Sequence, residues 1–204
     1  MQKELNIESK RIVFVGVGGQ GNLLATRLLG EACLAAGISA VASEIHGMAQ
    51  RGGIVESALV MGARSPIVSK GEADILLGFE PLETLRALNK CNNNTVVITN
   101  IHPLPPFTVA TGHGVYPDIC KITDLIRENI GSLITLDGDE LAARAGNPLS
   151  LNMVMLGTLI GSKLIPLDED LLRETISKTT KQAFLESNLK AFDFGIAAAR
   201  SFSL

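Results

Sequence analysis

Aromatic residues and clustered positive charge are scarce in this sequence. The 204 residues include no tryptophan and one tyrosine, and aromatic residues account for 4% of the total. Proteins that stack the bases of a single strand need several aromatic rings, so that class is excluded. The net charge is −3 and the lysines and arginines are scattered, which excludes the basic footprint of a DNA-binding protein. We therefore expect no nucleic-acid partner.

Cysteines and long apolar runs are scarce as well. The three cysteines are an odd number without a close pair, so neither a disulfide framework nor an iron–sulfur or other metal site is expected in this chain. No stretch approaches about 18 uninterrupted apolar residues, so no membrane contact is expected. The segment MQKELNIESKR lacks the apolar core of a secretory signal, and residues 1–10 are expected to be disordered. Together these features predict a cytoplasmic protein.

The abundant residues indicate one folded domain. Hydrophobic residues make up 46% and charged residues 19% of the sequence, which excludes intrinsic disorder. The length fits a single domain that spans residues 1–204. The mean hydropathy of +0.29 has two explanations, which are apolar surface covered by a partner and a core rich in alanine and leucine.

Short β-branched runs alternate with longer segments of helical apolar spacing. Strands are predicted at residues 11–16, 39–43, 54–61, 74–79, 95–99 and 133–136. Helices are predicted at residues 20–36, 81–89, 118–129, 137–145, 148–164 and 168–202, the last with a break near Asn188. Residues 44–53 and 101–116 are predicted to be irregular. The alternation predicts an α/β fold with an open, doubly wound, mostly parallel sheet, Rossmann-like, with helices on both faces. Its first strand, helix and second strand are expected to form a βαβ unit with a right-handed crossover.

A glycine-rich turn follows the first predicted strand. The sequence GVGGQG at residues 16–21 matches G-x-G-x-x-G in the strand-to-helix context of dinucleotide-binding folds. Gly16, Gly18, Gly19 and Gly21 are therefore a candidate loop for an anion or a phosphate at the helix amino terminus. Glu44, which follows Gly21 by 23 residues, stands about where such folds place a ribose-binding carboxylate. A tight turn without any ligand explains the same glycines equally well.

A second glycine-rich segment, EIHGMAQRGG at residues 44–53, displays polar side chains. Arg51 is suited to a bidentate contact with a carboxylate or phosphate, and His46 to hydrogen bonding or proton transfer. A subunit contact or ion pair for Arg51 and a loop-bracing hydrogen bond for His46 are the structural alternatives. The candidate residues for an active-site wall or a partner contact are Glu44, His46, Gly47, Gln50, Arg51, Gly52 and Gly53.

Taken in order, the two glycine-rich segments resemble a known family. VGVGGQGNLLATRLLGEA followed by SEIHGMAQRGG, and later NMVMLG at residues 152–157, are similar to the gamma-type domains of 2-oxoacid:ferredoxin oxidoreductases, above all the indolepyruvate type. The resemblance extends from about Arg11 to Arg200. Such enzymes convert a 2-oxoacid and coenzyme A into an acyl-CoA, carbon dioxide and reduced ferredoxin, using thiamine diphosphate, magnesium and iron–sulfur clusters.

The resemblance implies that this chain is a subunit without those cofactors. Thiamine sites of the family use a Gly-Asp-Gly run followed by paired asparagines, whereas here the asparagines of residues 92–94 precede the Asp-Gly-Asp of residues 137–139. The chain is then expected to dock on a larger catalytic subunit that holds thiamine diphosphate, Mg and the clusters and passes electrons to ferredoxin. Coenzyme A is the expected co-substrate, the two glycine-rich segments would shape the active site, and the isolated chain is expected to be inactive.

Other hypotheses stay open on the sequence alone. One is a self-contained NAD- or FAD-binding oxidoreductase of the Rossmann type, and another is a nucleotide-sensing module. A homodimer is also expected, because apolar helices near the carboxyl terminus need cover.

Overall fold

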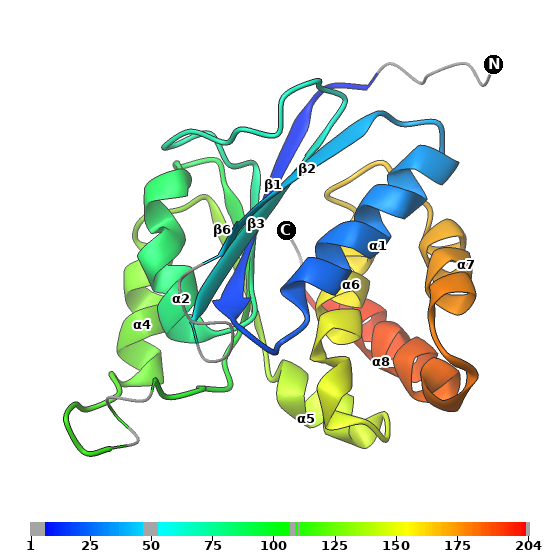
Figure 1. Ribbon diagram of the computed structural model, residues 1–204. Helices are drawn as coiled ribbons and strands as arrows, with labels where there is room; N and C mark the ends of the chain where they lie inside the picture. The colour runs from blue at the N-terminus through cyan, green and yellow to red at the C-terminus, as the bar shows by residue number, and fades with distance from the viewer. Residues whose placement is uncertain (1–6, 47–52, 107–108, 110, 203–204) are drawn as a thin grey trace.

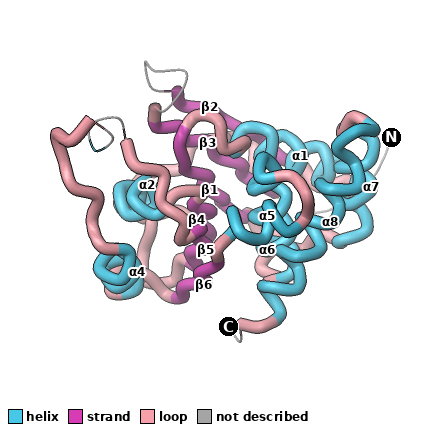
Figure 2. The backbone as a smooth tube through the Cα atoms, turned by 90° about the horizontal axis from the view of Figure 1, so that it is seen from below, coloured by secondary structure: helices cyan, strands magenta, loops and turns pink. Residues whose placement is uncertain are grey.

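The centre of the protein is a six-stranded sheet in the order β2-β3-β1-β4-β5-β6. A computed structural model describes residues 7–46, 53–106, 109 and 111–202. Figure 2 shows the strands as a single row with helices on both sides. Residues 1–10 were expected to be disordered; residues 1–6 lie outside this description, and Lys10 already belongs to β1. The strands are β1 Lys10–Val17, β2 Ala40–His46, β3 Ile54–Met61, β4 Ile75–Gly78, β5 Val96–Asn100 and β6 Ser132–Leu136.

Most of the sheet is parallel, as predicted. β1 pairs with β4, β4 with β5 and β5 with β6 in parallel, whereas β3 runs antiparallel to both of its neighbours, β1 and β2. The predicted βαβ unit is therefore split: β1 and β2 run in the same direction, but β3 lies between them. The short link from β2 to β3 explains why these two strands are antiparallel neighbours. The pairing of β3 with β1 then places β3 between β1 and β2.

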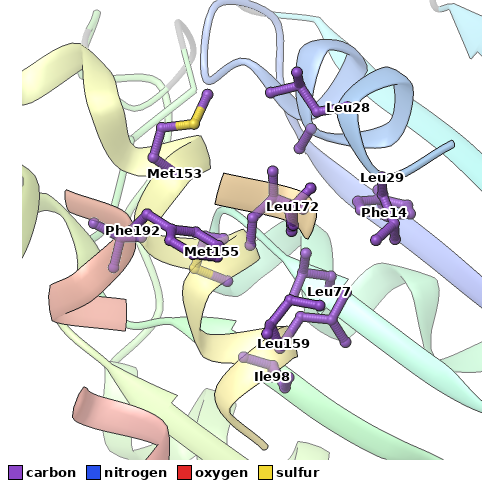
Figure 3. Close-up of a cluster of buried hydrophobic side chains, with 14 of the residues drawn as sticks. Phe14, Leu28, Leu29, Leu77, Ile98, Met153, Met155, Leu159, Leu172 and Phe192 are labelled. Carbon is purple, nitrogen blue, oxygen red and sulfur yellow. The ribbon is translucent and has the colours of Figure 1, made fainter. Parts of the chain in front are cut away.

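Helices cover both faces of the sheet, as predicted (Figure 1). One face carries α1 (Asn22–Ala35), α5 (Gly138–Arg144), α6 (Leu151–Gly161), α7 (Glu169–Thr179) and α8 (Gln182–Arg200), and the other carries α2 (Pro81–Arg86) and α4 (Ile119–Arg127). Short 3-10 turns follow at Ala87–Lys90 and Pro148–Ser150. Each face has its own hydrophobic cluster, and Figure 3 shows part of the larger one, over which α1, α6, α7 and α8 gather. No described helix is long and apolar enough to cross a membrane.

Among the differences from the predicted element boundaries, two concern β2 and the last helical segment. β2 continues to His46, so the start of the segment predicted to be irregular is strand. The last helical segment breaks at Thr180 and Lys181, where the backbone is extended, rather than near Asn188. Asn188 stays inside α8 because its side chain has partners there: its Oδ1 accepts a hydrogen bond of 2.7 Å from the Ser150 hydroxyl.

The buried α6 is the centre of the helical layer, and α8 packs closely against it. All 11 residues of α6 are buried. A Cβ added to Gly157 would lie 2.0 Å from the carbonyl oxygen of Phe192, and one added to Gly195 would lie 2.0 Å from that of Val154. Glycine at both positions therefore allows the two helix backbones to touch. The contact between α6 and α8 is thus covered within the chain, whereas Phe184 near the start of α8 is 51% exposed, and the homodimer stays a prediction.

We predict that Gly157→Ala destabilises the protein by about 3 kcal/mol, because the new methyl group forces α6 and α8 apart. Gly30→Ala is the matched control in the interior of α1, where an added Cβ would be 3.5 Å from Leu59 Cδ1, an ordinary contact. That control is expected to gain about 0.5–1 kcal/mol from helix propensity. Urea denaturation of both variants measures the difference, and equal stabilities would contradict the close packing.

Candidate functional site

The glycine-rich turn joins β1 to α1 at the carboxyl edge of the sheet. Gly19 and Gly21 have φ angles of +111° and +79°, which explains glycine at both positions. The backbone N–H of Gly18 donates a hydrogen bond of 2.8 Å to the carbonyl oxygen of Gly53. This bond holds the two glycine-rich segments of the sequence side by side.

The side chain of Gln20 fills the turn. Its Oε1 accepts a hydrogen bond of 2.8 Å from the N–H of Val17, and its Nε2 donates one of 2.9 Å to the carbonyl oxygen of Phe79. A Cβ added to Gly16 would lie 2.8 Å from Gln20 Oε1 and 2.9 Å from Phe79 Cβ. Gly16 is therefore required by the packing of Gln20 and Phe79, with or without a bound anion.

Asn100 at the end of β5 organises the neighbouring loops. The side chain is fully buried, and its Nδ2 donates to the Phe79 carbonyl oxygen at 3.0 Å and to Asp139 Oδ2 at 2.7 Å. Its Oδ1 accepts from the N–H groups of His102 and Gly138, at 3.2 and 2.9 Å. One buried amide thus fixes the loops that follow β4, β5 and β6.

A pocket of about 200 Å³ opens beside this network, above the glycine-rich turn. The carboxyl ends of β1 and β4 are adjacent here, and their following helices lie on opposite faces, which is where open α/β sheets bind ligands. The pocket is lined by Gly19, Gln20, His102, Pro103, Leu104, Asp139, Pro148, Leu149 and Leu151.

A separate apolar groove of about 260 Å³ lies between α1, α6 and α8. Leu149, which is 81% exposed, borders both the pocket and this groove.

Glu80 fastens the irregular segment that forms one side of the pocket. The carboxylate is 1% exposed; its Oε2 caps α2 through the N–H of Glu83, and its Oε1 accepts from the Leu104 N–H at 3.2 Å and the Tyr116 hydroxyl at 2.5 Å. Burial, followed by the hydrogen bond to Glu80, raises the pKa of Tyr116 well above its usual value. Tyr116 therefore stays a hydrogen-bond donor at neutral pH.

Glu83 is a buried carboxylate beside Glu80. Its Oε1 pairs with Arg86 at 2.6 Å, while its Oε2 is buried without a hydrogen-bond partner among the described residues. Burial raises the pKa of Glu83, and the charge of Arg86 opposes this rise. The ionised form is consequently costly in the folded protein.

Three side chains near the pocket have the chemistry of divalent-cation ligands. Donor atoms of His102, Asp137 and Asp139 lie within 4.8 Å of one another. Other contacts explain both carboxylates, since Asp137 caps α5 and Asp139 accepts from Asn100. We assign no ion to them.

The strand arrangement differs from that of a dinucleotide site. In such sites the ribose-binding carboxylate ends the strand that pairs with β1. Glu44 lies on β2, and β3 separates β2 from β1. The N–H of Gly18, the residue that would approach the pyrophosphate, already donates to Gly53. The geometry therefore does not favour the self-contained NAD- or FAD-binding hypothesis.

The other candidate residues fall partly outside the described chain. Glu44 and His46 belong to β2, and the Glu44 side chain is exposed. Gly53 borders the glycine-rich turn. The residues outside the description are Gly47, Gln50, Arg51 and Gly52.

Sequence reasoning missed Glu80, Asn100 and Asp139. The signal was available, because each follows or ends a predicted buried strand, and the carboxyl ends of parallel strands meet at one edge.

Comparison with known proteins finds similarity over nearly the whole length of this chain. The family model "Pyruvate ferredoxin/flavodoxin oxidoreductase" matches residues 11–198. Indolepyruvate oxidoreductase subunit IorB of Methanothermobacter thermautotrophicus is 40% identical over 189 residues, covering 92% of this chain and 96% of that protein.

Two solved structures share the fold. The gamma subunit of a keto/oxoacid ferredoxin oxidoreductase from Geobacter sulfurreducens has a TM-score of 0.69 at 21% identity, covering 95% of this chain and 99% of that chain. A 2-oxoglutarate:ferredoxin oxidoreductase from Magnetococcus marinus, solved with 2-oxoglutarate, coenzyme A and succinyl-CoA, has a TM-score of 0.73 at 21% identity. There the match covers 97% of this chain and 32% of the longer chain.

We predict that Gln20→Ala destabilises the protein by about 1–3 kcal/mol, because it leaves the Val17 N–H without its partner. Gln182→Ala, at the exposed start of α8, is the matched control and is expected to be neutral. Thermal denaturation of both variants tests this. Loss of stability in the control alone would contradict the role given to Gln20.

We predict that Glu83→Gln stabilises the protein at neutral pH. The folded-state pKa is raised, so the penalty is complete above that pKa and declines as the pH falls towards the unfolded value of 4.5. The advantage of Glu83→Gln should therefore shrink over that interval. Denaturant titrations at several pH values measure it, with the exposed Glu186→Gln as control. An advantage that grows on acidification would contradict the burial argument.

Proposed function

Since this chain belongs to the pyruvate ferredoxin/flavodoxin oxidoreductase family, we propose that it is the small subunit of a 2-oxoacid:ferredoxin oxidoreductase of the indolepyruvate type. The observation that carries the proposal is the nearly end-to-end match with a small subunit, over 96% of that protein. The enzyme would convert a 2-oxoacid and coenzyme A into an acyl-CoA and carbon dioxide, and ferredoxin would take up the electrons. The location expected for it is the cytoplasm.

A larger catalytic subunit would hold thiamine diphosphate and magnesium. The residues of this chain that most resemble the family's thiamine-binding motif support placing these cofactors on the partner. Asn92 lies before the amino end of β5, where its Nδ2 donates to Gly71, whereas Asp137 follows the carboxyl end of β6 and caps α5. Because β5 and β6 are parallel, Asn92 lies at the amino ends of these strands and Asp137 at their carboxyl ends. The two groups therefore cannot form one site.

The cysteines support placing the iron–sulfur clusters on the partner as well. Cys33 is buried in α1, Cys91 is half-buried before β5, and Cys120 is exposed on α4. Burial raises the pKa of Cys33 to about 12 and that of Cys91 to about 11, so neither is readily available as the thiolate that binds iron.

The carboxyl edge of the sheet would form one wall of the shared active site. The glycine-rich turn, Gly53 and the pocket beside His102 all lie at this edge. The exposed Leu149 and the adjoining apolar groove offer apolar area for contact with the larger subunit. On this proposal the chain orients substrate or coenzyme A and excludes water, while thiamine diphosphate on the partner supplies the carbanion chemistry.

Anaerobic purification of the tagged chain from its native host tests the assignment. The eluate should contain a larger protein with thiamine and iron, and should reduce a dye when given coenzyme A and a 2-oxoacid. A panel of indolepyruvate, pyruvate, 2-oxoglutarate and branched-chain 2-oxoacids then identifies the substrate. The isolated chain should show no turnover. A chain that purifies alone, or that binds NAD or FAD, would contradict the proposal.

We predict that Arg51→Ala lowers kcat/KM for coenzyme A or for the 2-oxoacid by about tenfold or more in the assembled enzyme. The reason is that one charge-assisted hydrogen bond to an anionic substrate contributes about 1.5–3 kcal/mol. Arg127→Ala, which removes an exposed arginine paired with Asp124 on α4, is the control. Full activity and normal assembly of Arg51→Ala would remove Arg51 from the active-site wall.

A further inference from the structure

β2 forms one edge of the sheet, and none of the described strands pairs with its outer side (Figure 2). Proteins usually protect such an edge with charged side chains, above all lysine, or with proline, a bulge or a very short strand. β2 has the sequence AVASEIH, spans 7 residues and pairs with β3 without a bulge. Its one carboxylate is Glu44, and it contains neither lysine nor proline, so most of the strand presents a template for a further strand.

The alternation of hydrogen-bonded pairs between β2 and β3 shows which backbone groups of β2 face outward. The N–H of Gly62 donates to the Ser39 carbonyl oxygen at 2.8 Å, so these two residues form a hydrogen-bonded pair just before β2. In an antiparallel ladder such pairs alternate with pairs that are not hydrogen-bonded. Val41, Ser43 and Ile45 therefore direct their backbone groups to β3. The residues that direct theirs outward are Ala40, Ala42, Glu44 and His46.

We propose that two copies of this chain pair antiparallel along β2, about a two-fold axis at Ser43, and so form one continuous sheet. All residues of β2 pair in this register. Val41 faces Ile45 of the second copy, and Glu44 faces Ala42. A register centred on Glu44 would place like charges opposite each other, and one centred on Ala42 would leave His46 without a partner in the second β2.

The occupant is a second copy because the edge is complementary to itself. Ile45 is 60% exposed, and the second copy's Val41 would cover it, while each copy's single carboxylate in β2 meets an alanine. β-branched side chains pack well against cross-strand neighbours and so favour a sheet. A two-fold axis supplies each such contact twice, which is the geometry of an isologous dimer.

Disulfide trapping tests the register. In the proposed dimer, Ser43 lies opposite Ser43 of the second copy, in a pair that is not hydrogen-bonded. The two Cα atoms of such a pair are about 4.5 Å apart, which is a distance suited to a disulfide. Ser43→Cys in a Cys120→Ser background, which removes the exposed thiol, should oxidise to a linked dimer. Ala42→Cys is the control, because Ala42 faces Glu44 instead. Equal linking of both variants, or of neither, would overturn the register.

Sedimentation equilibrium of the full chain tests the surface. We expect a dimer whose dissociation constant rises at least tenfold in Ile45→Lys. The same rise is expected in Ala42→Pro, because proline removes the outward-facing N–H of residue 42 without breaking a hydrogen bond between β2 and β3. Leu125→Lys, at a 48% exposed position on α4, should leave it unchanged. A monomer at all concentrations, or a dimer indifferent to both edge variants, would overturn the proposal. If the chain is monomeric and Ile45→Lys instead loses the larger subunit, the edge belongs to that partner and self-pairing is wrong.

Discussion

The carbonyl oxygen of Phe79 is the point on which the carboxyl edge of the sheet is assembled. It accepts one amide hydrogen bond from Gln20, in the turn after β1, and another from Asn100, the last residue of β5. Phe79 itself follows β4, so the two bonds tie the loops of three adjacent parallel strands to one atom. Asn100 carries the connection on to α5 through the N–H of Gly138. Because these groups are buried, leaving one of them without a hydrogen bond costs free energy of folding. The network therefore holds the walls of the pocket in place.

The same network changes the meaning of the glycine-rich motif. In a dinucleotide-binding fold its glycines make room for a pyrophosphate. Here the space beside Gly16 is filled by Gln20 and Phe79, and the N–H of Gly18 is taken by Gly53. The glycines therefore serve a turn that is already packed and hydrogen-bonded within the chain. A motif match establishes the strand-turn-helix geometry, whereas the side chain at the variable position decides what occupies the space.

Much of the fold is predictable because local patterns determine it. The β-branched runs identify the strands, Pro81 begins α2 and Asp168 caps α7 through the N–H of Asp170. Two features depend on contacts that are distant in sequence. The insertion of β3 beside β1 depends on pairing between strands, and Asn188 inside α8 has its hydrogen-bond partner, Ser150, in another element. Of the site, the sequence predicts the glycine-rich turn, but Glu80 and Asn100 acquire their roles only when neighbouring strand ends meet.

The position of β3 connects the topology with what the chain is able to bind. By entering the sheet antiparallel to β1, β3 brings its first residues, rather than a strand's carboxyl end, to the side of the glycine-rich turn. A backbone carbonyl from Gly53 therefore stands beside the turn, while Glu44 is carried one strand farther away. The insertion also makes β2 the outermost strand. One change in strand order thus replaces the acidic partner of a nucleotide ribose with an internal backbone contact. It leaves the chain with a preorganised wall, which suits a subunit that completes a site on another protein better than one that holds a dinucleotide alone.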